Sequence, residues 1–209
     1  MIDTMVKSKA FLALFILFIT IISCNDNSTF NPVKEVASAV QNIMSKTSSP
    51  KLIQEKKIGD FIYTASFRPA ELISKYEEES GVASKSNPGE LNQSLYFQLD
   101  IEHETFADEL LKFNISGYQQ YDKRIKYCSF NMIGDVSIIT GKDTIPCGLH
   151  HFERSFNIGS KTTFLLAFPV SAKSISEDVT LLYHDNLFEN GIVKFYFRKE
   201  LFNPDKYKS

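Results

Sequence analysis

The densest group of metal-ligating side chains is the sequence His-His-Phe-Glu at residues 150–153. Imidazole nitrogens and carboxylate oxygens bind divalent metals, so this run raises the hypothesis of a metal site. In a strand, the two histidines would point to opposite faces, whereas His151 and Glu153 would share a face. His103 and the adjacent His184 and Asp185 could complete a three-ligand site, but nothing in the spacing requires one. We therefore interpret these residues as ordinary histidines and predict no metal and no cofactor.

Two further residues with reactive chemistry are Cys128 and Cys147, which lie 19 positions apart on segments with strand-like patterns. In an oxidising compartment such a pair can form a disulfide, which would stabilise the fold by about 3 kcal/mol in an entropy model. Buried free thiols are also common in protein cores, and the sequence leaves both alternatives open. The chain has no Cys-x-x-Cys motif, which disfavours a thiol redox enzyme or a zinc ribbon.

The sequence lacks the motifs of the common catalytic sites. Gly-x-Ser-x-Gly is absent, and the nine glycines are scattered singly rather than gathered in a phosphate-binding loop. The acidic run at residues 77–79 and the basic run at residues 123–126 are typical of solvated surfaces. The basic run could also contact an acidic glycan or a lipid headgroup. These patterns predict no catalytic residue.

The N-terminus has the pattern of a targeting segment. Residues 11–22 form an apolar run interrupted by Thr20 alone, and Lys7 and Lys9 precede it. Twelve helical residues extend about 18 Å, which is short of the roughly 30 Å hydrocarbon core of a bilayer. A basic start, an apolar centre and a small residue at the end are typical of a signal peptide. We therefore predict that residues 1–23 are a signal peptide rather than a membrane span.

The sequence Ile21-Ile22-Ser23-Cys24 resembles the lipobox of bacterial lipoprotein signal peptides, in which apolar residues and one small residue precede a cysteine. The resemblance implies transfer of diacylglycerol to the Cys24 sulfur, cleavage before Cys24 and acylation of the new amine. Several acyl chains anchor a protein firmly, whereas one chain binds a membrane reversibly. The alternative is an ordinary secretory signal with an incidental cysteine.

The residue after Cys24 and the overall composition bear on location. Asn25 stands where an Asp would retain an enterobacterial lipoprotein in the inner membrane. The amino-acid composition, rich in Ile, Lys, Asn and Phe, resembles that of envelope lipoproteins of Bacteroidota. This resemblance implies the outer membrane, on its periplasmic or surface face. The net charge of −2 gives no electrostatic reason to expect binding to nucleic acid.

The remaining chain divides into a tether at residues 24–50 and a β-rich globular domain at residues 51–209. The tether could carry a short amphipathic helix at residues 33–44 or remain a disordered spacer. Pro69 begins a predicted helix that extends to residue 78, and residues 105–113 could form a helical turn or two. Apolar and polar residues alternate most regularly at residues 95–102. The other predicted strands are residues 61–67, 124–132, 136–140, 144–149, 161–168, 179–183 and 192–198.

About eight strands with few short helices predict a mainly β protein, an antiparallel β-sandwich with one or two short helices. The strand number suggests an immunoglobulin-like sandwich, although the Cys, Trp and Cys arrangement of that fold is absent. A chain of this size, with 43% hydrophobic residues, can bury one sizeable core.

Together these patterns predict a lipid-anchored envelope protein with a non-catalytic binding or scaffolding role. Its expected partners are the membrane, through acyl chains on Cys24, and an envelope protein or glycan. An envelope hydrolase acting on glycans is one alternative, and it requires a cleft with paired carboxylates or convergence of His151 and Glu153 with His184. An inhibitor- or immunity-type lipoprotein that captures a protein partner is the other. It predicts an exposed apolar patch of several hundred Å².

Overall fold

The computed structural model describes residues 51–79, 91–154 and 159–207, all of which belong to the unit Asn42–Ser209. The predicted signal peptide, Cys24 and the predicted helix at residues 33–44 lie outside the described residues.

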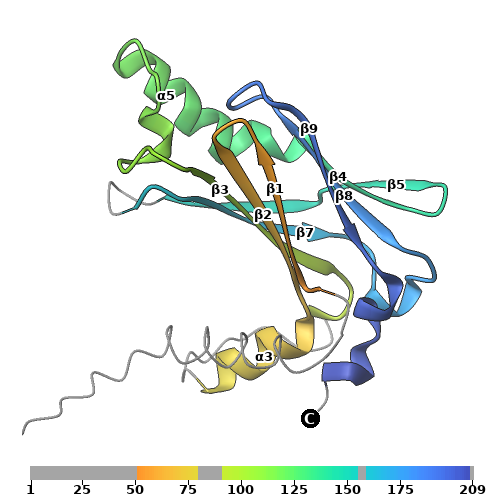
Figure 1. Cartoon of the computed structure of the whole chain (residues 1–209). Helices are drawn as coiled ribbons and strands as arrows, with labels where there is room; N and C mark the ends of the chain where they lie inside the picture. Colours follow the sequence, from red (N-terminus) through yellow and green to blue (C-terminus); the bar gives the residue numbers. More distant parts are fainter. Residues whose placement is uncertain (1–50, 80–90, 155–158, 208–209) are drawn as a thin grey trace, which may run out of the picture. The chain divides into compact units, whose positions relative to one another are not determined.

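In this part of the chain, the strands form two antiparallel sheets (Figure 1). The five-stranded sheet has the order β1 (Ile53–Ile58), β2 (Phe61–Arg68), β3 (Leu95–His103), β7 (Thr162–Phe168) and β6 (Leu149–Glu153). The four-stranded sheet has the order β5 (Asp143–Pro146), β4 (Val136–Thr140), β8 (Val179–Asp185) and β9 (Gly191–Phe197). The prediction of a mainly β, antiparallel sandwich is confirmed.

The order of the strands differs from that of an immunoglobulin domain. In that fold the first two strands share a sheet with the fourth and fifth. Here the first three strands are successive neighbours, and β4 and β5 belong to the other sheet. The strand number alone therefore suggested the wrong connectivity within the correct architecture.

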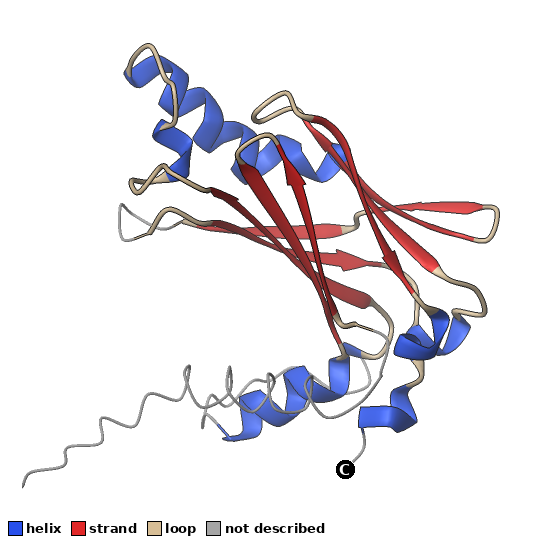
Figure 2. Cartoon of the chain, viewed as in Figure 1, coloured by secondary structure: helices blue, strands red, loops and turns tan. Residues whose placement is uncertain are grey.

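The helical segments are short and lie beyond the ends of the strands (Figure 2). Two are α-helices, α3 (Ala70–Glu79) and α5 (Tyr118–Lys126), and η2 (Tyr127–Asn131) is π-helical. The 3₁₀ turns are η1 (Leu110–Lys112), η3 (Met132–Asp135), η4 (Ala172–Ser174), η5 (Lys199–Phe202) and η6 (Pro204–Tyr207). The predicted helix at residues 69–78 and the helical turn within residues 105–113 are confirmed as α3 and η1.

Aromatic side chains fill the interior between the sheets because alternate residues of each strand point inward. The ring centroids of Phe97 on β3 and Phe197 on β9 lie 5.1 Å apart, so rings from the two sheets are in contact. Tyr63 on β2 and Tyr183 on β8 approach each other in the same way, with centroids 6.4 Å apart. Each fully buried large apolar side chain stabilises the fold by about 1.5–3 kcal/mol relative to exposure.

The two sheets are joined along both sides. On one side the backbone N–H of Cys147 donates to the Val136 carbonyl, and the N–H of Gly148 donates to the Ala167 carbonyl, so the chain passes from one sheet into the other. On the other side the Gln54 side-chain amide of β1 hydrogen-bonds both the backbone N–H and the carbonyl of Tyr196 on β9. These contacts satisfy backbone groups at edges that would otherwise be open.

One predicted strand is wrong. Residues 124–132 form the end of α5, the whole of η2 and the start of η3. Ile125, Cys128 and Met132 pack on the core at spacings of three and four, which is the helical period rather than the strand period. The predicted strand at 144–149 is divided, because β5 ends at Pro146 and β6 begins at Leu149. Pro146 lies on an edge strand, where a residue without a backbone N–H is tolerated.

Candidate functional site

A continuous helical segment, residues 118–135, lies across one end of the two sheets and is labelled α5 in Figure 1. It passes from α-helix through a π-helical turn to a 3₁₀ turn. π-helical turns are rare and often occur at functional sites. We call these residues the end segment.

The end segment is held by buried residues of its C-terminal half, and exposed aromatic side chains occur in both halves. Cys128 and Met132 are buried in the core, whereas α5 has no buried residue. The side chain of Tyr118 is 79% exposed and that of Phe130 is 73% exposed. Large apolar side chains held in water by a fixed helix are typical of recognition surfaces rather than of cores.

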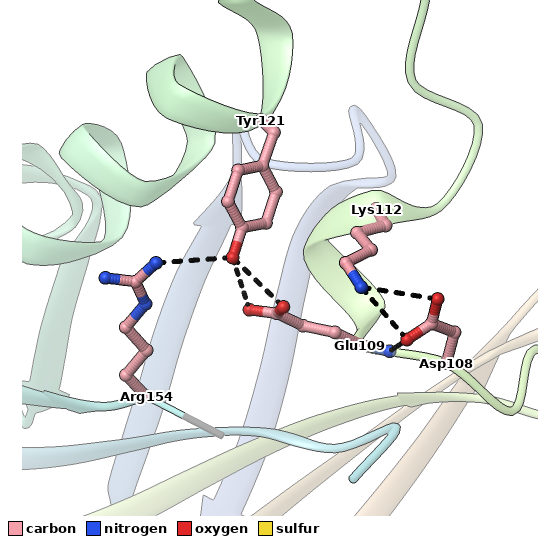
Figure 3. Close-up of polar contacts among 5 residues, drawn as sticks. All are labelled: Asp108, Glu109, Lys112, Tyr121 and Arg154. Atoms are coloured by element: carbon pink, nitrogen blue, oxygen red, sulfur yellow. Dashed lines mark hydrogen bonds and ion pairs between the residues drawn. The ribbon is translucent and has the colours of Figure 1, made fainter. Parts of the chain in front are cut away.

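A buried carboxylate connects α5 to the strands beneath it (Figure 3). Glu109 is 2% exposed, and the hydroxyl of Tyr121 donates to its Oε1 and Oε2 atoms, at 3.0 Å from each. The guanidinium Nη2 of Arg154, just after β6, donates to the Tyr121 oxygen at 3.4 Å. This contact raises the pKa of Arg154. One phenol oxygen therefore joins η1, α5 and the end of β6.

The neighbouring Asp108 organises the start of η1 (Figure 3). Its Oδ1 atom accepts the backbone N–H of Glu109 at 2.6 Å, and its carboxylate lies 3.3 Å from the ammonium of Lys112. The backbone N–H contributes most to lowering the pKa of Asp108, and Lys112 adds to it. Because the pair is solvent-exposed, its contribution to stability is small.

Arg124 joins the end segment to two loops. Its Nη1 atom donates to the carbonyl oxygens of Leu111, at 3.0 Å, and Phe113, at 2.6 Å. Its guanidinium carbon lies 5.2 Å from the ring centroid of Phe188, which is a cation–π distance. Burial lowers the pKa of Arg124. Arg124 belongs to the basic run at residues 123–126, which was interpreted as a solvated surface. Its guanidinium instead binds carbonyl groups and an aromatic ring of the same chain.

A second buried carboxylate, Asp185 at the end of β8, lies beneath the end segment and is 1% exposed. It has five hydrogen-bond donors, two on Oδ2 and three on Oδ1. They are the hydroxyls of Tyr63 (2.5 Å) and Tyr183 (3.0 Å), the side-chain amide of Asn190 (3.1 Å), and the backbone N–H groups of Leu187 (3.1 Å) and Phe188 (3.0 Å). Burial, together with the charge of Asp185, raises the pKa of Tyr63 and of Tyr183.

A third carboxylate, Asp135, fixes the C-terminal end of the segment. Its Oδ2 atom accepts the hydroxyl of Tyr127 at 2.6 Å, and its Oδ1 atom accepts the side-chain amide of Asn186 at 2.8 Å. Burial and Asp135 raise the pKa of Tyr127. In the described residues, no buried side-chain nitrogen or oxygen lacks a hydrogen-bond partner. Glu109 and Asp135 therefore hold the end segment directly, and Asp185 fixes the strands and the turn beside it. The exposed side chains of the segment include Tyr118, Lys123 and Phe130.

The structure separates the histidines that the sequence singled out. His150 lies with its Nε2 atom 2.9 Å from the Cys128 carbonyl oxygen, under the end segment. His151 and Glu153 are exposed on the opposite face of β6, as their spacing predicted.

The other two histidines lie elsewhere. The His103 ring lies among aromatic rings, with its centroid 4.3 Å from that of Phe113 and 4.9 Å from that of Phe61. His184 is exposed on β8, in the other sheet. No group of three or more His, Cys, Asp or Glu side chains suited to a metal ion occurs among the described residues.

Cys128 and Cys147 are free and buried in this structure, which is one of the two alternatives that the sequence left open. Cys128 lies on η2, and Cys147 lies where the chain passes from β5 to β6. Burial raises the pKa of the Cys128 thiol to about 12 and also raises that of Cys147. Neither thiol is activated as a nucleophile, because nucleophilic cysteines have lowered pKa values.

Sequence reasoning missed the hydrogen-bonding roles of Glu109, Tyr121 and Asp185. No short motif marks them, because their partners are distant in the chain: Tyr63 and Asp185 are 122 positions apart. The one local signal is the polar turn Asp185-Asn186 after an alternating strand, which predicts a side-chain-capped turn.

No family model, curated protein or solved structure matches this chain. Among the described residues, no helix has the length and apolar character needed to cross a bilayer.

Proposed function

We propose that this protein is a lipid-anchored protein of a bacterial envelope, with a non-catalytic binding role performed by its β-sandwich. The observation that carries the proposal is the sequence Ile21-Ile22-Ser23-Cys24 at the end of an apolar run too short to span a bilayer. Acyl chains on Cys24 would hold the domain at the membrane through the tether at residues 24–50. The outer membrane is the expected location, because Asn25 follows Cys24.

The arrangement of polar groups supports a binding role. The carboxylates of Glu109 and Asp135 accept hydrogen bonds from Tyr121 and Tyr127 of the end segment, so they serve to position it. The buried carboxylate of Asp185 fixes strands and a turn of the same chain. That segment displays Tyr118 and Phe130 on a fixed helical frame. Exposed aromatic side chains with little freedom to move lose little entropy on binding.

Metabolic labelling with an alkyne fatty acid tests the anchor. The wild-type chain should incorporate the label and partition with membranes, and Cys24→Ala should do neither. Cys147→Ala is the matched control, because it removes a cysteine that is buried in the domain and should keep the label. Equal labelling of wild type and Cys24→Ala would exclude the anchor.

A hydrolase activity on envelope glycans is the alternative that a second measurement separates. Purified wild-type chain incubated with peptidoglycan and with capsular polysaccharide should release no new reducing ends. Release that Glu109→Gln abolishes, while the melting temperature stays unchanged, would replace the binding role with a catalytic one.

A further inference from the structure

An open depression of about 630 Å³ lies at one end of the outer face of the four-stranded sheet, away from the end segment's carboxylates. Ile139 on β4 and Thr180 on β8, which are paired neighbours, contribute to its floor. Its walls include residues 176–178 and residues 198–200.

An exposed tyrosine stands beside this floor. Tyr196 on β9 pairs with Thr180 across the sheet, so its side chain is on the same outer face as those of Thr180 and Ile139. The side chain is 56% exposed. Its backbone N–H and carbonyl are both held by the Gln54 amide. The Tyr196 ring therefore projects from a strand that pairs with β8 on one edge and is held by Gln54 on the other.

The charged side chains around the depression do not neutralise one another. Glu177, Asp178 and Glu200 are acidic, and Arg198 and Lys199 are basic. Within the described part of the chain, none of these five side chains forms an ion pair. All five are exposed, so the hollow is lined by hydrogen-bond acceptors and donors that a ligand can reach.

Gly141, in the turn between β4 and β5, shapes one side of the hollow. Its φ of +58° lies in the left-handed region that favours glycine. A Cβ atom at this position would lie 2.9 Å from Oε1 of Glu177. The absence of a side chain therefore lets the Glu177 carboxylate approach the turn.

We propose that this depression binds a neutral oligosaccharide. Sugar hydroxyls both donate and accept hydrogen bonds, so they match a hollow in which carboxylates accept and a guanidinium and an ammonium donate. The C–H face of a sugar ring packs on an aromatic ring such as that of Tyr196. Three acidic and two basic side chains nearly balance, which disfavours a polyanionic glycan. The inference rests on the proposed binding role in the envelope, and it places a ligand class at this depression rather than at the end segment.

A peptide strand fits this face less well. β5, at one edge of the sheet, contains Pro146, which has no N–H to donate. β9, at the other edge, has its Tyr196 backbone occupied by Gln54. Strand addition needs a row of unpaired backbone groups, and each edge strand of this sheet has a backbone position that cannot pair with an added strand.

Saturation-transfer NMR and calorimetry on the full chain in detergent micelles test the proposal. The probes are chitotetraose, cellotetraose and maltotetraose, which are neutral, and tetragalacturonate, which is acidic. At least one neutral probe should bind, and about tenfold more tightly than tetragalacturonate. Tyr196→Ala should weaken that binding about tenfold or more, and Glu177→Gln should weaken it several-fold.

Matched variants on the five-stranded sheet are the controls. Leu149→Ala removes an apolar side chain that is even more exposed than Tyr196, and Glu55→Gln removes an exposed carboxylate, so both should keep the wild-type affinity. A melting temperature for each variant shows whether it folds, and Glu177→Gln remains informative if Tyr196→Ala unfolds.

Two results would overturn the inference: no binding of any probe at about 10 mM, or an affinity loss no larger for Tyr196→Ala and Glu177→Gln than for the controls. Lipid labelling at Cys24, measured on the same samples, keeps the tests separate. Retained label without sugar binding would remove the ligand class and leave the anchor in place.

Discussion

At the scale of single residues, buried carboxylates decide how one end of this domain is arranged. A carboxylate withdrawn from water is costly unless hydrogen bonds replace its hydration. Asp185 meets this requirement with donors from β2, β8 and the turn that follows β8. Because its donors come from both sheets, one side chain couples the sheets to each other and to the turn beneath the end segment.

Replacing that carboxylate with an amide should destabilise the fold. Asp185→Asn turns one acceptor into a donor that faces other donors, so we expect the free energy of unfolding to fall by about 3 kcal/mol. Urea titration of wild type and variant measures the difference. Asp143→Asn, an exposed change in the β4–β5 hairpin, is the control and should shift stability by less than about 0.5 kcal/mol. Equal effects of the two substitutions would contradict the role given to Asp185.

At the scale of elements, the end segment illustrates how tertiary contacts select a local structure. Its residues 124–132 can be interpreted as an alternating strand, but burial of Cys128 and Met132 requires the helical spacing. α5 has no fully buried residue, so its partly buried Tyr121 and Ile125 and polar contacts such as that between Tyr121 and Glu109 hold it. A helix with so little apolar burial opens more readily than one with a fully buried apolar face.

Removing the Tyr121 hydroxyl should therefore loosen α5 without unfolding the domain. In Tyr121→Phe the Glu109 carboxylate loses the phenol that joins it to Arg154, and the local opening free energy should fall by about 1–1.5 kcal/mol. Hydrogen exchange followed by mass spectrometry should show roughly tenfold faster exchange in α5 and unchanged exchange in β3 and β8. Tyr118→Phe is the control, because the Tyr118 side chain is largely exposed. Faster exchange throughout the domain would show that the contact stabilises the whole fold instead.

At the scale of the whole molecule, burial of phenols and thiols links stability to alkaline pH. The pKa of Cys128 and that of Tyr207 are each raised to about 12, chiefly by burial. The pKa values of Cys147, Tyr63, Tyr127 and Tyr183 are raised as well. Above about pH 9 the unfolded chain releases protons that the folded chain retains, so the free energy of unfolding must fall as the pH rises.

The expected result is a stable domain up to about pH 9, with the urea midpoint then falling steadily toward about pH 11. Circular dichroism at a series of pH values measures it. Cys128→Ala removes one of the contributing groups and should reduce the slope of that fall. A midpoint that stays constant between these pH values would show that these groups are not buried from water.

The sequence by itself was enough to predict most strands and the mainly β class, because the alternation of apolar and polar residues is a local property of a chain. The strand order was decided only by the tertiary structure, as were the helical form of residues 124–132 and the contacts between Gln54 and Tyr196, 142 positions apart. Those contacts depend on which surfaces meet after folding, and no local pattern encodes the partner of a side chain across two sheets. The predicted lipobox at Cys24 is the converse case, because a processing enzyme would recognise such a signal along the chain and would require no folded structure.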